Sequence, residues 1–367
     1  MLNSFQYAPL VVAAADEAEG VVMRLGQFLP GALAGGLAID LGTANTLIYS
    51  KNRGIVCNEP SMVALRCDGR GARKVLAVGT EAKAMLGRTP GSVVVARPLS
   101  DGVIADFEAA REMLRYFIRK VSRHSFITRP RVVVSVPAEI SPVERRAVKE
   151  SAESAGASEV ILMNEPIAAA LGSGLPILEP QGSMVVDIGG GTSDVAVLSM
   201  GSIVVSRSLR TAGDKMDREI MEQVKRRHNL RIGERTAEML KLMLGSAIAE
   251  PETKTLEIMG RDELSGQPKT VEIDDEEIRE ALHGPVNQLV ESVHSVLEQT
   301  PPELLRDVAD NGLMLTGGGA LLRNLDVLLS QEIGVTAKVS EDPLGAVVRG
   351  AGRIVEDPSL LERLSLE

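Results

Sequence analysis

Aromatic residues are scarce in this sequence. It contains no tryptophan, three tyrosines and five phenylalanines, although hydrophobic residues make up 44% of the chain. That share is ordinary for a globular protein, so the core has to be built mostly from aliphatic side chains. Cysteine is equally rare. Cys57 and Cys67 are too few for a disulfide framework, which excludes the small disulfide-stabilised proteins and fits a reducing cytoplasm.

An excess of positive charge and long hydrophobic runs are also missing. The net charge of −10 argues against a general nucleic-acid-binding surface, although local basic patches remain compatible with it. The apolar run at 9–15 is too short to span a membrane, and no Lys or Arg precedes it, so we do not expect a secretory signal. The four histidines show no metal-ligand spacing and are expected at the surface or at helix ends: His124, His228, His283 and His294.

Two segments of the chain share one pattern, and its length of 367 residues leaves room for two domains. Each segment runs from an apolar strand through an Asp, an apolar residue, a Gly and a small polar turn into a second apolar strand. The first contains Asp40 and the second contains Asp187, about half the chain apart. This spacing favours a duplicated fold.

The turns in these two segments have the composition of phosphate-binding loops. Small residues let main-chain amides approach phosphate oxygens, and an Asp at the end of a strand can hold Mg²⁺, usually through water. A third glycine turn follows at Thr316-Gly317-Gly318-Gly319. Two ordinary β-hairpins with glycine turns are the alternative interpretation. The sequence therefore predicts a nucleotide site assembled from both halves of the chain.

Hydrophobic periodicity and helix-capping residues predict the elements around these turns. We expect a helix over 107–121, a buried strand over 131–137, a helix from Ser141 to about Ser154, and a short helix that begins at 164–166 and ends by Gly174. Ser141, Pro142 and Glu144 form a capping-box pattern, so Glu144 is interpreted as a cap rather than a catalyst.

The second half alternates helices with strands in the same manner. The expected elements are helices over 214–229 and 236–246, a hairpin or small sheet within 250–273, a helix from 274 to 298 interrupted at Gly284-Pro285, a strand over 313–315, and helices over 320–331 and 344–355. Strands that lead into phosphate turns, followed by helices, indicate an α/β fold with the nucleotide in a cleft between the halves.

The first 36 residues precede the first core strand. Within them, Val21, Val22, Leu25, Phe28 and Leu29 fall on one helical face. A membrane-surface helix is one interpretation. A helix docked on the protein's own body, or a disordered leader, is the other.

From about Leu37 to its C-terminus the chain resembles the MreB family of bacterial actins, within the superfamily of actins and heat-shock-chaperone ATPases. The resemblance rests on Asp40-Leu41-Gly42-Thr43-Ala44-Asn45-Thr46-Leu47-Ile48-Tyr49, Asn58-Glu59-Pro60-Ser61, Asp101-Gly102-Val103-Ile104-Ala105-Asp106-Phe107, Val143-Glu144-Arg145-Arg146-Ala147, Asn164-Glu165-Pro166-Ile167-Ala168-Ala169-Ala170, the second phosphate turn, Gly213-Asp214-Lys215-Met216-Asp217 and Leu315-Thr316-Gly317-Gly318-Gly319-Ala320.

The resemblance implies an actin-like ATPase fold, in which two ribonuclease-H-like domains surround a central nucleotide cleft. The expected boundaries are a leader over 1–36, a first half over 37–175 with an insertion at about 58–100, a second half over 176–355 with an insertion at about 214–282, and a tail over 356–367. The implied ligands are ATP and Mg²⁺.

The resemblance also assigns roles to single residues. Asp40 and Asp187 would flank Mg²⁺, Glu165 would position the attacking water, and Thr192 would lie near the γ-phosphate. The residues implied to contact the nucleotide are Thr43, Ala44, Asn45, Gly189, Gly190, Gly191, Glu238, Lys241, Gly317, Gly318, Gly319 and Ala320. Taken alone, Glu165 would be interpreted as an acid favoured by the dipole at a helix start.

One departure from the family pattern is visible. Thr192-Ser193-Asp194-Val195 stands where Thr-Thr-Glu-Val is expected in many relatives. The shorter acid keeps the charge but retracts it, so we expect an effect on the tuning of hydrolysis and none on the chemistry of the motif.

The implied function is a weak ATPase coupled to polymerisation. Its membrane-associated filaments would organise cell-wall elongation and maintain a rod shape. They would lie on the inner face of the cell membrane, reach cell-wall elongation proteins through transmembrane adaptors and bind no nucleic acid. Two protofilaments would pair antiparallel through the helix that carries Val143.

Membrane attachment is predicted at a second place besides the leader. Phe126 and Ile127 are adjacent apolar residues in a segment without helical or strand periodicity, and basic residues surround them: Arg119, Lys120, Arg123, Arg129 and Arg131. Apolar tips within a basic ring suit an anionic bilayer. The alternative is a phenylalanine folded back onto its own domain.

Two other classes of ATPase share parts of this pattern. One is the ATPase domain of a heat-shock chaperone, because Asn164-Glu165-Pro166 followed by alanines occurs there too. It would be expected to continue into a substrate-binding domain beyond Glu367. The other is a sugar or acetate kinase of the same fold, for which we identify no substrate pocket with a catalytic Asp. The family-specific motifs favour the filament.

Overall fold

The structure is a computed structural model that describes residues 36–67, 73–122 and 129–364. The leader with its predicted helical face and the predicted membrane-contacting pair, Phe126 and Ile127, lie outside these residues.

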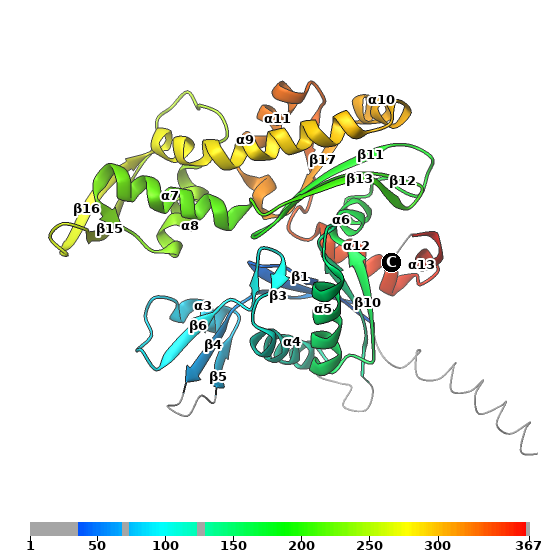
Figure 1. Cartoon of the computed structure of the whole chain (residues 1–367), viewed down its shortest axis with the longest axis horizontal. Helices are drawn as coiled ribbons and strands as arrows, with labels where there is room; N and C mark the ends of the chain where they lie inside the picture. Colours follow the sequence, from blue (N-terminus) through cyan, green and yellow to red (C-terminus); the bar gives the residue numbers. More distant parts are fainter. Residues whose placement is uncertain (1–35, 68–72, 123–128, 365–367) are drawn as a thin grey trace, which may run out of the picture.

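Two five-stranded sheets form the centre of the molecule (Figure 1). The first has the order β10-β9-β1-β2-β3 and the second the order β13-β12-β11-β17-β18. Their bounds are β1 Leu37–Leu41, β2 Asn45–Ser50, β3 Gly54–Pro60, β9 Arg131–Val136, β10 Glu159–Asn164, β11 Ser183–Ile188, β12 Ser193–Ser199, β13 Ser202–Leu209, β17 Leu313–Thr316 and β18 Ala337–Val339.

The two sheets repeat one topology. In each, an antiparallel hairpin (β1–β2 or β11–β12) supplies the central strand, a third strand extends the hairpin antiparallel, and two later strands add in parallel on the other side. The predicted duplication of an α/β unit is therefore confirmed.

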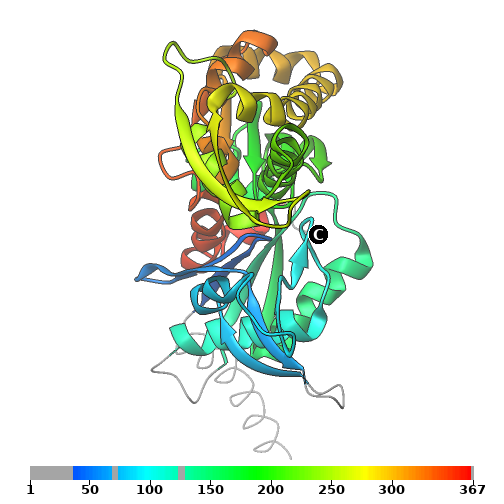
Figure 2. The same cartoon turned by 90° about the vertical axis from the view of Figure 1, so that its left-hand side faces the viewer.

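Each half carries a smaller sheet beside its main one (Figures 1 and 2). In the first half it consists of β4 Val63–Cys67, β5 Arg73–Val78 and β6 Val93–Ala96, with the helix α3 Thr80–Met85; the short pair β7 Leu99–Ser100 and β8 Val103–Ile104 follows. In the second half β14 Leu230–Arg231, β15 Thr255–Asp262 and β16 Pro268–Asp274 lie with α7 Gly213–His228 and α8 Glu234–Leu244. The hairpin expected within 250–273 is thus present.

The helices predicted in the first half are confirmed as α4 Phe107–Val121, α5 Pro142–Ala155 and α6 Glu165–Gly172. The capping box of α5 is formed as expected. The Ser141 hydroxyl accepts from the Glu144 amide at 3.3 Å, and the Glu144 carboxylate accepts from the Ser141 amide at 2.9 Å. The Glu144 side chain therefore accepts a hydrogen bond from a backbone amide at the start of its own helix.

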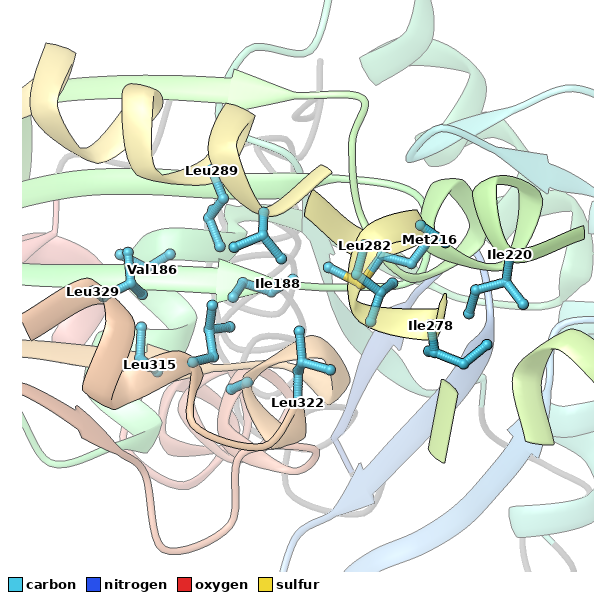
Figure 3. Packing of buried hydrophobic residues seen from close by; sticks show 14 of the residues in the cluster. Val186, Ile188, Met216, Ile220, Ile278, Leu282, Leu289, Leu315, Leu322 and Leu329 are labelled. Atoms are coloured by element: carbon cyan, nitrogen blue, oxygen red, sulfur yellow. The ribbon is translucent and has the colours of Figure 1, made fainter. Parts of the chain in front are cut away.

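The predicted interruption at Gly284-Pro285 is wrong. Helix α9 runs without a break from Asp275 to Gln299, with Pro285 inside it. Proline costs roughly 3 kcal/mol in a helix interior. Tertiary packing outweighs that cost here, because Leu282 and Leu289 are buried in the core of the second half on both sides of the proline (Figure 3).

The helix predicted over 320–331 is two elements. A 3₁₀ turn η1 spans Gly318–Leu321, and α11 begins only at Leu325 and ends at Ile333. Between them Asn324 takes a left-handed conformation, and its amide donates to the Ser246 hydroxyl at 2.9 Å. Arg323 donates to the Gly245 carbonyl at 2.9 Å. These contacts with a distant segment replace the helical bonds that the local pattern predicts.

The chain ends with α10 Pro302–Asn311, α12 Ala346–Glu356 and α13 Leu360–Arg363. Helix α13 follows the helix that was expected to be the last. As predicted, the core is aliphatic: the second-half cluster in Figure 3 consists of Val, Ile, Leu, Ala and Met side chains.

Helices α6 and α12 cross where the halves meet, and each contacts the sheet of the other half. Helix α12 packs on β1, β2 and β9 of the first sheet, whereas α6 contacts β11 and β12 of the second as well as β9 and β10. A Cβ on Gly172 would lie 1.8 Å from the carbonyl oxygen of Ala346, and one on Gly350 would lie 1.8 Å from that of Ala168. The absence of a side chain at Gly172 and Gly350 therefore lets the two backbones come into contact.

Candidate functional site

A cavity of about 320 Å³ lies between the two halves. Both predicted phosphate turns and the third glycine turn line it. Of the residues predicted to contact nucleotide or metal, or to act in catalysis, those on the wall are Asp40, Thr43, Ala44, Asn45, Glu165, Asp187, Gly189, Gly190, Gly191, Thr192, Glu238, Lys241, Gly317, Gly318 and Gly319. Ala320 differs, because it is buried in the core of the second half and does not face the cavity.

The two phosphate turns touch one another across the cavity. A Cβ on Gly190 would lie 2.6 Å from the Ala44 Cβ, and one on Gly191 would lie 2.5 Å from the Thr43 hydroxyl. The same hydroxyl accepts from the Gly102 amide at 3.0 Å. Glycine at these positions lets both turns present main-chain amides to the same small space. This geometry suits a chain of phosphate groups between the halves.

Three carboxyl groups face the cavity beside these turns: Asp187 and Glu165 are buried, and Asp40 is half-buried. Asp40 accepts from the Ser135 hydroxyl at 3.0 Å, and Asp187 accepts from the Thr316 hydroxyl at 2.8 Å. Burial raises the pKa of Asp40 to about 6 and that of Asp187 to about 7. Burial, with the nearby acidic charges, also raises the pKa of Glu165 well above its ordinary value. The acidic groups also act on one another, because the charge of Asp40 contributes to the raised pKa values of both Asp187 and Glu165.

This donor set fits Mg²⁺. Carboxylate oxygens are the ligands that Mg²⁺ prefers, and the ion usually keeps several waters and takes phosphate oxygens rather than a full protein cage. Within 36–67, 73–122 and 129–364, no group of three or more His, Cys, Asp or Glu side chains is placed to hold a metal by itself. Asp40 and Asp187 would therefore share the ion with water and the nucleotide.

The raised pKa values predict how stability depends on pH. The folded-state pKa values of Asp40 and Asp187 lie above their ordinary value of 3.8, so both groups favour the folded state when protonated. That contribution is complete below about pH 4 and is lost as the pH rises through the folded values. In EDTA and without nucleotide, we expect the thermal unfolding midpoint to fall by a few degrees between about pH 6 and about pH 8.

The matched variant is Asp187→Asn, which removes one of the two titrations. Its midpoint should fall less over the same pH range. A wild-type midpoint that stays level or rises, or an equal fall in the variant, would contradict this assignment of the buried charge.

Helix α8 supplies the polar groups at the other end of the cavity. The Lys241 ammonium donates to the Gly213 carbonyl at 2.9 Å and pairs with the Asp217 carboxylate at 2.9 Å. Glu238, one turn earlier, pairs with Lys83 of α3 at 3.0 Å. Both predicted residues thus reach the cavity, and the structure shows the partners that hold them in place.

Sequence reasoning assigned no role to several residues that also line the cavity. Asp214 and Asp217 lie in the first turns of α7, within a motif that was recognised without a function. The acidic start of that helix was the available signal. The apolar wall could not be foreseen, because Met216, Leu242 and Leu344 come together only through tertiary folding.

Asp194, the departure from the family pattern, does not line the cavity. It is buried, and its Oδ1 accepts from the Ala138 amide at 3.3 Å. Burial raises its pKa to about 7. Asp194 therefore joins β12 of the second half to the segment after β9 of the first.

The remaining predicted position lies away from the cavity. Val143 is 79% exposed near the start of α5. Among the helices of the described ranges, none combines the length and the apolar character needed to cross a bilayer.

Comparisons with known proteins agree with this architecture. The MreB/Mbl protein family matches residues 34–363. The chain is 52% identical to the cell shape-determining protein MreB of Escherichia coli over 328 residues, which cover 89% of this chain and 94% of that protein. It is 49% identical to the cell shape-determining protein Mbl of Bacillus cereus over 330 residues, covering 90% and 98%.

A solved structure shares the fold over nearly the same length. It is MreB5 of Spiroplasma citri bound to ADP, with a TM-score of 0.83 and 38% identity over 89% of this chain and 97% of that one. The same protein bound to AMPPNP also gives a TM-score of 0.83, with 37% identity, 90% of this chain and 98% of that one. With an actin-like α/β ATPase fold and relatives of this similarity, the chain belongs to the MreB/Mbl family.

Proposed function

We propose that this protein binds and hydrolyses ATP and polymerises into membrane-associated filaments that organise cell-wall elongation and maintain rod shape. One observation carries the proposal: the two phosphate turns and the carboxyl groups of Asp40, Glu165 and Asp187 converge on one cavity between the halves. The relatives named cell shape-determining proteins and the nucleotide-bound MreB5 structures support it.

The residues of the cavity divide the work of hydrolysis. The main-chain amides of 43–45 and 189–191 would bind the phosphates, and Asp40 and Asp187 would hold Mg²⁺, which would supply positive charge to screen the phosphate oxygens. Glu165 orients the attacking water and accepts hydrogen bonds from it, while Thr192 lies beside the γ-phosphate. Lys241 and Glu238 contact the ribose and the base, and the glycine turn at 317–319 packs on the adenosine. Ala320 supports that turn from the core.

Assembly is tested by pelleting and electron microscopy. ATP with Mg²⁺ should bring the protein into the pellet as paired filaments, because a repeated head-to-tail contact grows without closing. The proposed lateral contact lies at α5, so Val143→Glu should leave single filaments, since it places a charge at an exposed apolar position. Leu264→Glu is a matched control, because Leu264 is also exposed, at 84%, but lies on the β15–β16 hairpin. Paired filaments of the Val143 variant would contradict this role.

Attachment to the membrane is proposed to use Phe126 and Ile127. Replacing both by Ser should preserve ATP-driven assembly and reduce co-flotation with anionic liposomes, because each subunit contributes a weak contact that polymerisation multiplies. Deleting residues 1–30 tests the leader in the same assay. If the double variant floats like wild type while the truncated protein does not, the leader carries the attachment. We propose that the filaments reach the cell-wall elongation proteins through transmembrane adaptors.

A further inference from the structure

Arg97 of the first half is bonded to two helices of the second half. It follows β6, and its guanidinium donates to both carboxylate oxygens of Asp214, at 3.0 and 3.1 Å. The other terminal nitrogen donates to Glu234 at 2.9 Å. Asp214 lies in the first turn of α7 and Glu234 in the first turn of α8. One side chain thus fastens the first half to the starts of two helices.

The charges on the two sides of this junction are complementary. Lys83 and Arg97 face the acidic residues Asp214, Glu234 and Glu238. Asp214 and Glu238 also line the cavity, so these ion pairs lie at its edge. An exposed ion pair contributes little to stability, but a partly buried arginine that bonds two carboxylates is a stronger link. The Arg97 side chain is 31% exposed.

The bonds of Arg97 and the crossing of α6 and α12 join the two halves on opposite sides of the cleft. The halves are joined on one side by the close crossing of α6 and α12, where glycines let the backbones touch. The elements joined by the bonds of Lys83 and Arg97, which are α3, β6, α7 and α8, lie on the other side (Figure 1). A fixed crossing on one side and a breakable ion-pair link on the other allow the cleft to open by rotation.

We propose that Arg97 holds the nucleotide cleft closed, so that breaking its bonds to Asp214 and Glu234 limits the release of a nucleoside diphosphate. This inference rests on the proposed nucleotide binding. It makes Arg97 a positioning residue, which acts through α7 and α8 and forms no part of the catalytic group.

The test measures release of a fluorescent ADP analogue from the full-length protein with Mg²⁺, below the concentration at which it assembles, after mixing with excess ATP. Arg97→Gln should release the analogue about tenfold faster than wild type, because a guanidinium that bonds two carboxylates is lost. Arg97→Lys, which keeps the charge without the fork, should fall between the two. Added salt should accelerate release from wild type more than from Arg97→Gln.

The control breaks an ion pair of similar kind inside one half. Arg73 pairs with Asp106 at 2.6 Å, and both belong to the first half. Arg73→Gln should release the analogue at the wild-type rate. Should Arg97→Gln fail to fold, Glu234→Gln tests the same link from the other side, because Glu234 does not line the cavity.

The outcomes separate this inference from the proposed function. A wild-type protein that binds no nucleotide overturns the proposed function and the inference with it. Nucleotide binding with equal release rates for wild type and Arg97→Gln overturns the inference alone. Equal acceleration by Arg73→Gln does so too, because the effect would then be a general loss of stability.

Discussion

Gly350→Ala should destabilise the folded protein by about 3 kcal/mol or more, near or beyond the upper end of overpacking effects. The added methyl group would lie 1.8 Å from the backbone carbonyl oxygen of Ala168 in α6. A backbone carbonyl in a packed helix cannot rotate away as a side chain can, so α6 and α12 would have to separate. Separation would open a hydrophobic cluster that is shared by both halves and contains Ile167 and Val347.

The measurement is chemical unfolding of wild type and variant, with Gly284→Ala as the matched control. Gly284 also lies inside a helix, and a Cβ there would meet nothing within 4 Å. Because alanine favours a helix over glycine by about 1 kcal/mol, this control should be as stable as wild type or more so. Gly172→Ala should repeat the loss seen with Gly350→Ala. If the Gly350 variant unfolds at the wild-type denaturant concentration, the close crossing of the helices is wrong.

Glu165→Gln should slow phosphate release by roughly 10²-fold or more while ATP binding persists, because a positioned catalytic group is lost. The same change should raise stability at about pH 8 in the absence of nucleotide, because Glu165 is buried and its pKa is raised. Slower phosphate release together with higher stability would identify Glu165 as a catalytic group. A structural acid at the start of α6 would give the reverse result, with lower stability and unchanged hydrolysis.

Phosphate release and thermal unfolding are measured on the same preparations, with Glu144→Gln as the control. Glu144 is also an acid in the first turn of a helix, but it is only half-buried and caps α5 through Ser141. Its replacement should lower stability slightly and leave hydrolysis unchanged. Wild-type turnover by the Glu165 variant would remove Glu165 from the chemistry.

Features that depend on neighbouring residues could be predicted from the sequence. Aspartate and glycine at strand ends specified the two turns, and Ser141 with Glu144 specified the start of α5. Predictions from neighbouring residues failed where contacts with distant segments determine the backbone conformation. Pro285 stays helical because core packing surrounds it, and Asn324 leaves the helix because it bonds to Ser246.

The site shows the same division. Its turns and carboxylates are short motifs that a sequence displays directly. The pairs that join the halves are not: Arg97 lies 117 positions before Asp214, and Lys83 lies 155 positions before Glu238. A lysine or arginine in a polar segment has many equally plausible partners, and only the arrangement of both halves selects one.

The crossing of α6 and α12 has the symmetry of a two-fold dimer. Residues 168 and 172 meet residues 346 and 350 in a reciprocal arrangement, as the same patch does on both subunits of an isologous interface. Each of the two helices also packs on the main sheet of the other half, α6 on β11 and β12 and α12 on β1, β2 and β9. The chain therefore has the construction expected of two fused subunits: each half has a hydrophobic cluster of its own, and a further cluster, to which both helices contribute, is shared between them.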